Sequence, residues 1–402
     1  MKRFKDYLGK NIPLFEGGNL TVNNIQAQKI DMTKSGRKEF VNKSLKLFKH
    51  INKLFKRKYG EPLWVNEKNL DTGKMFNGST SFIFSPEYSD EEILAHKTKS
   101  GDIDIIIEKE KAGDLWKLLE EYKNKEILPG ITYIGSNRTS DAKLGNQINS
   151  IFKITFDNGY SVMAQVDFEM LEVNPDGEPN EFARFSHSSS FEDAKIGLKG
   201  YAHKMLLRAL ASSSSMIEDI IVITPSSTKD KYKIKVKGGE PLTKINNAKF
   251  SADKGLRFPA YEKQDFQING KDVYKEIPPK ESTYEQKLEG MFEIFFGKKP
   301  TSNQLKDMWS FAGLSKLIKR YLSKKQIKVI YQRLVDLAWD KNAQELERDS
   351  AEIDYQIKNG MVSKFEELLG ISRPQKVEKQ IKEYYAKYGS RRWKHLNNID
   401  KV

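Results

Sequence analysis

The chain has 402 residues, enough for two or three domains, and with 38% hydrophobic and 31% charged residues its composition is that of a soluble globular protein. No apolar stretch reaches the roughly 18–20 residues that a membrane-spanning helix needs, which argues against a membrane protein. The sequence has no cysteine, which excludes disulfides and thiolate zinc sites and fits a reducing compartment such as the cytoplasm. The formal net charge of +14 is compatible with a polyanionic partner and equally with a lysine-rich solvated surface.

The first residues, MKRFKDYLGKNIPLFEGGNL, form a short basic segment that lacks the apolar run of a secretory signal. Residues 1–16 resemble the targeting propeptides of proteins packed inside the heads of large tailed phages. Those propeptides are basic and amphipathic and are cut after a Leu/Ile-x-Glu site, which Leu14-Phe15-Glu16 matches. The resemblance implies a location inside a virion and then in the host cytoplasm. The alternative is an N-terminal helix that packs on the body of the protein.

The next hundred residues predict a long helix and then a buried strand. Apolar residues recur at helical spacing over 37–58, which predicts an amphipathic helix. The segment FNGSTSFIF (76–84) predicts a turn with strand-like flanks. A polar stretch then leads into KSGDIDIIIEK (99–109), whose run of isoleucines predicts a buried strand.

Helices and strands alternate over the following hundred residues. Helical patterns are found over 112–125 and 191–212, and strands are predicted over 130–136 and 150–171. The segment 150–171 contains Asp157-Asn158-Gly159, and an Asn-Gly dipeptide between apolar runs strongly favours a hairpin.

The second half of the chain changes character twice. Residues 218–280 alternate short strand-like pieces with turns, and Pro278-Pro279 marks a boundary after which the pattern is helical. We therefore predict an α+β protein with a first domain over 17–217, a small β-rich middle segment over 218–280 and an α-helical C-terminal domain with a basic tail over 281–402.

Two aspartates stand inside the isoleucine strand. Strand alternation places Asp102 and Asp104 on the same face, where two carboxylates repel each other unless a cation lies between them. Asp167, in the apolar strand AQVDFEM, can complete an oxygen cage of the kind that Mg²⁺ or Mn²⁺ prefers. Upstream, the turn Gly78-Ser79 offers backbone N–H groups to a phosphate group. The alternative is that the aspartates lie on an edge strand and face water.

The pattern NGST…GDIDIII…QVDFEM resembles the signature of the polymerase β-type nucleotidyltransferase superfamily, over roughly residues 40–215. The resemblance implies a mixed sheet with flanking helices. It also implies that Asp102 and Asp104 bind two metal ions, that Asp167 ligates the catalytic metal and helps to activate the acceptor hydroxyl, and that Gly78 and Ser79 hold the triphosphate. The segment between Ser79 and Asp102 is longer than is usual in the family, so an inserted loop is expected.

Further candidate contacts follow the third aspartate. In the predicted helix 191–212, Lys195, Lys199 and His203 are spaced i, i+4, i+8 and are candidates for nucleotide binding, with a solvated basic face as the alternative. Glu169 shares the face of Asp167 and is either a spare ligand or a solvated surface residue.

Candidate contacts to nucleic acid are basic residues scattered over the chain: Arg138, Arg184, Arg208, Arg391 and Arg392. For the last two, a partly ordered basic tail is the alternative.

These features predict a metal-dependent enzyme that moves a nucleoside monophosphate from an NTP to an acceptor hydroxyl and releases pyrophosphate. A nucleic-acid acceptor, with an RNA 3′ end favoured, is expected from the charge. Two alternatives stay open: the same transfer to a protein or small molecule, and a non-enzymatic nucleic-acid-binding or phage internal protein on a degenerate nucleotidyltransferase scaffold.

Overall fold

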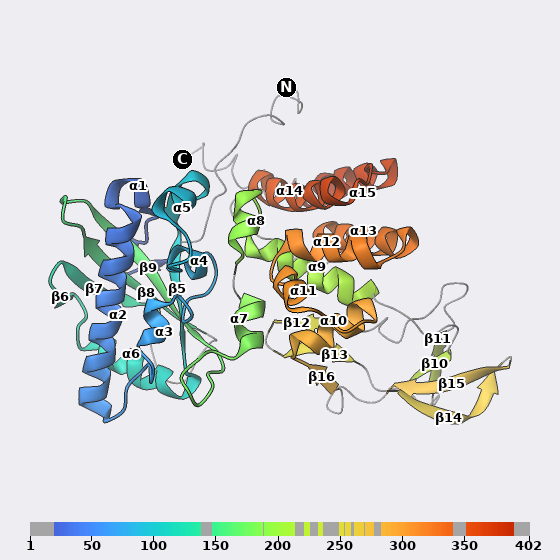
Figure 1. Ribbon diagram of the computed structural model, residues 1–402, viewed down its shortest axis with the longest axis horizontal. Coiled ribbons are helices and arrows are strands. Elements are labelled where there is room, and N and C mark those ends of the chain that lie inside the picture. The colour runs from blue at the N-terminus through green and yellow to red at the C-terminus, as the bar shows by residue number, and fades with distance from the viewer. Residues whose placement is uncertain are drawn as a thin grey trace. The chain divides into compact units, whose positions relative to one another are not determined.

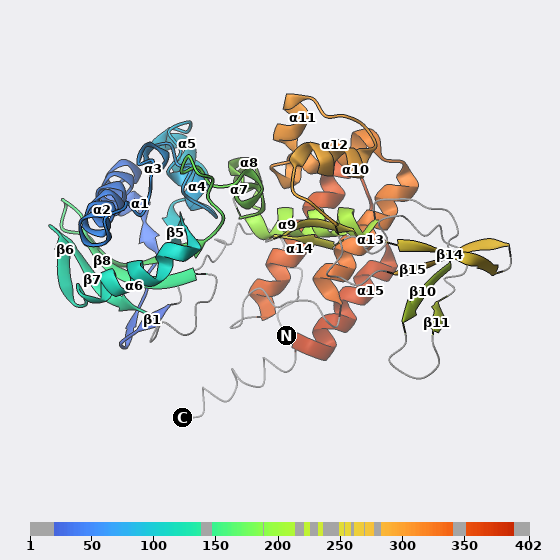
Figure 2. The same ribbon diagram turned by 90° about the horizontal axis from the view of Figure 1, so that it is seen from below.

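The computed structural model describes most of the chain, namely residues 20–137, 147–187, 189–213, 221–225, 232–235, 249–252, 254–258, 261–268, 270–276, 283–340 and 351–389. The chain divides into two compact units, Met1–Pro179 and Asn180–Val402 (Figure 1, Figure 2). The first unit therefore ends well before residue 217, the predicted end of the first domain. Among the described helices, none is both long and apolar enough to cross a membrane.

The first unit is built on a five-stranded mixed sheet with the strand order β5-β9-β8-β7-β6. Its strands are β5 (Asp102–Ile107), β6 (Lys125–Leu128), β7 (Ile131–Ser136), β8 (Gln147–Thr155) and β9 (Ser161–Met170). β5 pairs with β9 in parallel, and the other neighbours are antiparallel. The hairpin predicted at Asn158-Gly159 is confirmed, and Gly159 takes the left-handed conformation that this turn needs, with φ of 82°. The predicted mixed α+β character is thus present in this unit.

The long helix α2 (Arg37–Tyr59) covers one face of this sheet. The ring of Phe48 on α2 packs edge-on against Phe168 of β9, with centroids 6.4 Å apart. In the parallel register Phe168 lies beside Ile105, so both side chains point toward α2. Alternation then turns Asp104 and Asp167, the adjacent pair in the register, toward the opposite face. The predicted helix over 37–58 is confirmed, and its apolar stripe fixes which face of the sheet is left for the aspartates.

Short elements complete the first unit, and they are β1 (Thr21–Val22), β2 (Ile25–Gln26), β3 (Ile30–Asp31), β4 (Lys99–Ser100), α1 (Met32–Ser35), α3 (Lys68–Asp71), α4 (Thr80–Ile83), α5 (Asp90–His96), α6 (Ala112–Glu120) and the 3₁₀ turn Lys109–Lys111. The hairpin of β1 and β2 packs Val22 against Ile134 and Ile151, on the face of β7 and β8 opposite to α2.

Two predictions for this unit are wrong in detail. The helix predicted over 112–125 ends at Glu120, and Lys125 already belongs to β6. The segment after Ser79 forms one helical turn, α4, where a strand-like flank was predicted. Both segments are too short for periodicity to distinguish a helical turn from a strand.

The second unit is largely helical, with α7 (Glu181–His187), α8 (Phe191–Lys195), α9 (Gly200–Ser213), α10 (Leu288–Phe296), α11 (Ser302–Asp307), α12 (Phe311–Tyr321), α13 (Lys324–Trp339), α14 (Ala351–Leu369), α15 (Gln375–Tyr384) and the π-helical turn Tyr385–Gly389. One hydrophobic core joins α9 to α10, α12, α13, α14 and α15. This explains why the unit begins at Asn180, because α7 and α9 bury their apolar faces among the C-terminal helices and Asp193 of α8 accepts from the first backbone N–H groups of α12.

The β-rich middle segment is confirmed where it is described. Its strands are β10 (Ile221–Pro225), β11 (Tyr232–Lys235), β12 (Lys249–Ser251), β13 (Gly255–Phe258), β14 (Tyr261–Ile268), β15 (Lys271–Glu276) and β16 (Thr283–Glu285). They form a four-stranded sheet, β11-β10-β15-β14, and a three-stranded sheet, β12-β13-β16. Phe250 and Leu256 of the smaller sheet are buried in the helical core. The predicted boundary at Pro278-Pro279 lies outside the described residues.

The continuous helix predicted over 191–212 is wrong. α8 ends at Lys195, Gly197 takes a left-handed conformation with φ of 76°, and α9 begins at Gly200. A Cβ on Gly200 would lie 2.4 Å from Ser189 Oγ, so this glycine permits a close approach of the two segments. The break separates residues that the predicted helix would have aligned.

Candidate metal centre

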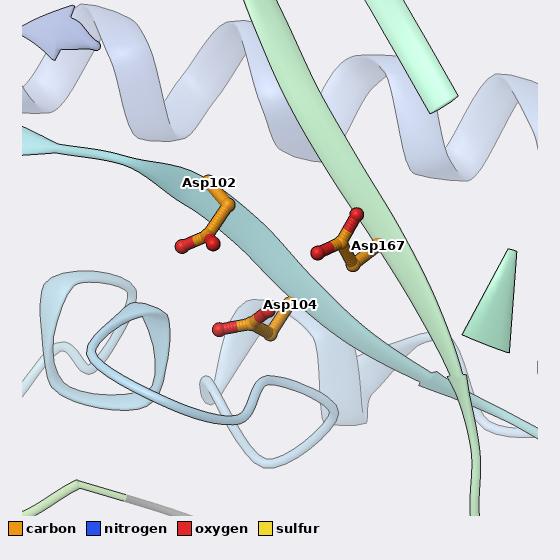
Figure 3. A group of neighbouring side chains, drawn as sticks. All are labelled: Asp102, Asp104 and Asp167. Atoms are coloured by element: carbon orange, nitrogen blue, oxygen red, sulfur yellow. The ribbon is translucent and has the colours of Figure 1, made fainter. Parts of the chain in front are cut away.

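Three carboxylates converge on the face of the sheet opposite to α2. One oxygen each from Asp102, Asp104 and Asp167 lies within 4.8 Å of the others, and Figure 3 shows the three side chains projecting from the neighbouring strands β5 and β9. The parallel register places Asp104 beside Asp167 and Asp102 beside Gln165. Since β-strand side chains alternate, the register alone is enough to bring the three to one face. This arrangement could hold a metal ion.

Asp167 is the most buried of the three, with 5% of its surface exposed, whereas Asp102 and Asp104 are half-buried. Burial, together with the negative charges of Asp102 and Glu169, raises the pKa of Asp167 to about 7. Hydrogen bonds from Asn149 and Gln165 act in the opposite direction and lower this pKa. The mutual repulsion of the carboxylates is the condition that a bound cation relieves.

Two amides hold Asp167 in place. Asn149 Nδ2 donates to Asp167 Oδ1 at 2.8 Å, and Gln165 Nε2 donates to both carboxylate oxygens at 3.0 and 2.9 Å. Neither residue was identified from the sequence. The signal was present, because the hairpin turn fixes a register in which Asn149 lies opposite Asp167, and Gln165 shares its face two residues earlier.

The segment before Gly78 is attached to the outer edge of β5. Ile106 N donates to Met75 O at 2.8 Å and Asn77 N donates to Asp104 O at 3.1 Å, with an isolated bridge between Phe76 and Ile105. The buried hydroxyl of Thr80 accepts from Asp104 N at 3.2 Å. These bonds fix the Gly78 turn next to the aspartate strand, and Thr80 is a third residue that the sequence did not single out.

Gly78 lies directly against the carboxylate of Asp104. Its φ is 52°, and a Cβ built on it would lie 2.2 Å from Asp104 Oδ2. Any side chain here would displace that carboxylate as well as strain the backbone. Ser79 follows as the N-cap of the four-residue helix α4 without a side-chain capping bond. The absence of a side chain at Gly78 thus lets the Asp104 carboxylate approach the main chain closely.

Glu169 is neither a member of the carboxylate group nor a solvated residue. It is half-buried, and Asn77 Nδ2 donates to its Oε2 at 2.5 Å. Asn77 is 1% exposed, so this bond joins β9 to the turn that carries Gly78.

The segment between Ser79 and Asp102 is ordered. It contains α4, α5 and β4, and Ser89 and Glu92 form a capping box at the start of α5. The nearly buried side chain of Arg37 on α2 donates to Ile83 O at 2.9 Å, to Ser85 O at 2.8 Å and to the Asp90 carboxylate at 2.8 Å. These residues are therefore anchored on the helix that supports the sheet.

The basic stripe predicted after Asp167 is not formed. Lys195 ends α8 and pairs with Glu192 at 2.8 Å, Lys199 lies in the turn after α8, and His203 is on α9. His203 is 2% exposed, and its Nε2 lies 2.8 Å from Met308 O. Burial lowers the pKa of His203 to about 4, so the ring is neutral. Its place in the core of the second unit contradicts a role in binding nucleotide.

The predicted arginine contacts are only partly described. Arg184 is half-buried with its guanidinium 5.7 Å from the Trp309 ring centroid, and Arg208 is half-buried beside Met205. Three further arginines and the predicted targeting segment lie outside the described residues: Arg138, Arg391, Arg392 and residues 1–16.

Comparisons of the chain with protein-family models, with curated proteins and with solved structures found no match. The interpretation of the site therefore depends on its own geometry and chemistry.

Proposed function

We propose that the protein is a metal-dependent nucleotidyltransferase of the polymerase β type, which transfers a nucleoside monophosphate from an NTP to the hydroxyl of an acceptor. The observation that supports this most is the convergence of Asp102, Asp104 and Asp167 within 4.8 Å beside the Gly78 turn. Three carboxylates form a hard-oxygen donor set, which fits Mg²⁺ or Mn²⁺. The raised pKa of the buried Asp167 fits the same assignment, because a cation would relieve the repulsion that contributes to it.

In this proposal Asp102 and Asp104 hold divalent cations, and Asp167 holds the one next to the acceptor. The bound cations would neutralise phosphate charge and polarise the acceptor hydroxyl. Asn149 and Gln165 orient the Asp167 carboxylate by donating to it. Gly78 leaves room for Asp104, and the backbone N–H groups of the Gly78-Ser79 turn would bind the triphosphate.

The proposed transfer forms one bond and breaks one. The acceptor oxygen bonds to the α-phosphorus of the NTP, and the bond from that phosphorus to the bridging oxygen breaks. Pyrophosphate leaves with the electron pair of the broken bond. The proton of the acceptor hydroxyl passes to the Asp167 carboxylate and from there to water. A nucleic-acid acceptor, with an RNA 3′ end favoured, is proposed because the chain has a net charge of +14.

The test is a transfer screen with NTPs and dNTPs labelled at the α-phosphorus. Total RNA, tRNA, DNA and a protein lysate are offered as acceptors, with Mg²⁺, with Mn²⁺ and with a chelator. We expect label on an acceptor only when a divalent cation is present. Asp102→Asn and Asp104→Asn should each reduce transfer by about 10³-fold or more, because they remove a charge that holds the cations.

Asp114→Asn is the matched control, because Asp114 is a surface residue of the same unit that pairs with Lys117 on α6. It should keep full activity. Labelling of protein that is insensitive to added RNA or DNA would replace the nucleic-acid acceptor with a protein. Absence of transfer to every acceptor, or full activity in Asp104→Asn, would refute the proposed function.

A further inference from the structure

A strongly basic region lies where α12 ends and α13 begins. From Lys316 to Arg333 the chain has seven Lys and Arg residues and no Asp or Glu. All seven side chains are exposed, and none forms an ion pair within the described part of the chain. Nothing in the carboxylate site of the first unit involves these residues, so the charge needs a separate explanation.

The fold adds a further cation from a distant part of the sequence. The ring of Tyr321 at the end of α12 lies beside two cations, Lys298 from the loop after α10 and Arg320, each 5.3 Å from the ring centroid. The same ring packs against Phe292 and Phe296 of α10, which fixes its position in the core. We define the basic corner as the exposed residues gathered at this junction: Lys298, Lys316, Arg320, Lys324, Lys325 and Lys328.

The corner residues on the two helices are close together by chain geometry. Lys316 and Arg320 are about one turn, or 6 Å, apart along α12, as are Lys324 and Lys328 along α13. The four residue-to-residue steps from Arg320 to Lys324 span at most about 14 Å. A linear polyanion whose charges repeat every few ångströms can therefore meet several of these cations at once.

The charges at the start of α13 are unfavourable for the isolated helix. Lys324 and Lys325 occupy the first turn of α13, which has no acidic residue, and positive charge there opposes the helix dipole. Lys324 and Lys328 repel each other at i,i+4, as do Lys316 and Arg320 on α12. An anionic partner would relieve this repulsion.

The chemistry of the corner favours nucleic acid over a lipid surface. Helices that bind membranes expose large apolar side chains beside their basic residues. Among the described residues of α12 and α13, Val329 is the one large apolar side chain that is exposed, at 44%, while the apolar stripes of both helices are buried in the core. The corner instead offers cations around an anchored aromatic ring, a combination found at nucleic-acid surfaces.

We propose that the basic corner binds the phosphodiester backbone of a nucleic acid. The assignment of the bound strand as the acceptor rests on the proposed nucleotidyl transfer, whereas the binding itself does not. Backbone contacts carry no base specificity, so binding should depend on salt and little on sequence.

The test compares the full chain with two triple variants of equal charge change. Lys324→Gln/Lys325→Gln/Lys328→Gln removes three charges from the corner. The matched control, Lys376→Gln/Lys379→Gln/Lys382→Gln, removes three exposed lysines from α15, where Glu378 and Glu383 are interspersed. Binding of fluorescent single-stranded RNA and DNA of one sequence is measured by anisotropy over a range of salt, with a chelator present so that the carboxylate site plays no part.

We expect the corner variant to bind about tenfold or more weakly at low salt, with a salt slope smaller by about 2, because about 0.7 counterions are released per contact to a single strand. The control should stay within about twofold. The thermal midpoint of the corner variant should be equal to or above that of the wild type, because the substitutions remove charges opposed to the helix dipole. A loss on RNA alone or on DNA alone supports the proposal and identifies the polymer.

Equal weakening in both variants would overturn the proposal, as would the absence of binding to either polymer at low salt. Corner-dependent binding to phosphatidylserine vesicles without binding to oligonucleotides would assign the surface to membranes instead. Corner-dependent binding without nucleotide transfer would refute the proposed function alone and leave this inference standing.

Discussion

The two units surround their buried carboxylates in different ways. In the first unit three carboxylates lie within 4.8 Å of one another, and repulsion from Asp102 and Glu169 adds to the burial that raises the pKa of Asp167. Among the described residues of the second unit, each buried carboxylate faces a donor. Asp354 pairs with Lys358 at 3.2 Å on α14, and Asp193 accepts from Phe311 N and Ala312 N at 2.7 and 3.1 Å, where it caps α12.

This difference separates two uses of a buried charge. When a buried carboxylate meets a cation or backbone N–H groups of its own unit, these contacts offset the free-energy cost of its desolvation. Such a carboxylate contributes to the packing of the fold. Carboxylates that lie close together repel one another, which raises the free energy of the metal-free folded state. A bound cation lowers this free energy. The first arrangement is structural, and the second is the arrangement of a binding site.

The largest expected effect on stability comes from breaking a buried pair of the second unit. Lys358 is fully buried, so Lys358→Met leaves Asp354 in the core without its ammonium partner and should cost about 3–5 kcal/mol. Hydrogen-exchange mass spectrometry should show lost protection in peptides of α14 and α15 and none in those of the first unit. Replacing both partners, Lys358→Met/Asp354→Leu, should restore much of the protection. An equal loss in the double variant would contradict a structural role for the charge pair.

The carboxylate site should show the opposite behaviour, because removing a charge there stabilises the metal-free protein. The folded-state pKa of Asp167, about 7, lies above the ordinary value of 3.8, so the folded state binds more protons between these limits. The contribution of this group to the free energy of unfolding therefore falls as pH rises from about 4 to about 7, by at most about 4 kcal/mol, and is constant above that range.

Thermal unfolding of the protein in the presence of a chelator measures this pH-dependent contribution of Asp167 to stability. Asp167→Asn should unfold at a higher temperature than wild type near pH 8, and the difference should vanish near pH 4. Adding Mn²⁺ at pH 8 should raise the midpoint of the wild type and leave that of the variant unchanged. A variant that is less stable than wild type at pH 8 would show that Asp167 is a structural residue.

A smaller effect is expected at Gly78. Gly78→Ala should cost about 2 kcal/mol, because the methyl group meets Asp104 Oδ2 and the backbone has a positive φ. Gly60→Ala is the matched control, since Gly60 has φ of 86° and open space around its Cβ, and it should cost only about 1 kcal/mol. Transfer activity and Mn²⁺ affinity should fall in the first variant and stay unchanged in the second. Equal behaviour of the two would show that only the backbone strain matters.

Much of the candidate site could be predicted from the sequence because it depends on local rules. Strand alternation places Asp102 and Asp104 together, and the Asn-Gly hairpin sets the register of Asp167 with Asn149. The stripe of α2 is a long amphipathic pattern, which is the most reliable of local signals.

The errors lie where tertiary packing decides. Helical spacing aligns Lys195, Lys199 and His203 only if the helix continues, and the turn at Gly197 ends it. Spacing also cannot show that His203 lies on the side that meets Met308. The bonds of Thr80 to β5 join residues more than 20 positions apart, and no local pattern specifies them. The boundary at Asn180 depends on which core receives α7 to α9, which is a property of the whole chain.

The converging carboxylates of the first unit are expected to bind divalent cations, and the paired carboxylates of the second unit are not. Titration of the metal-free protein with Mn²⁺, followed by the paramagnetic resonance signal of the free ion, tests this claim most directly. We expect saturable binding by wild type, binding lost in Asp104→Asn, and binding retained in Asp193→Asn, which alters a carboxylate that is equally buried but bonded to backbone. Equal Mn²⁺ affinity of wild type and Asp104→Asn, or no saturable binding by wild type, would contradict the claim.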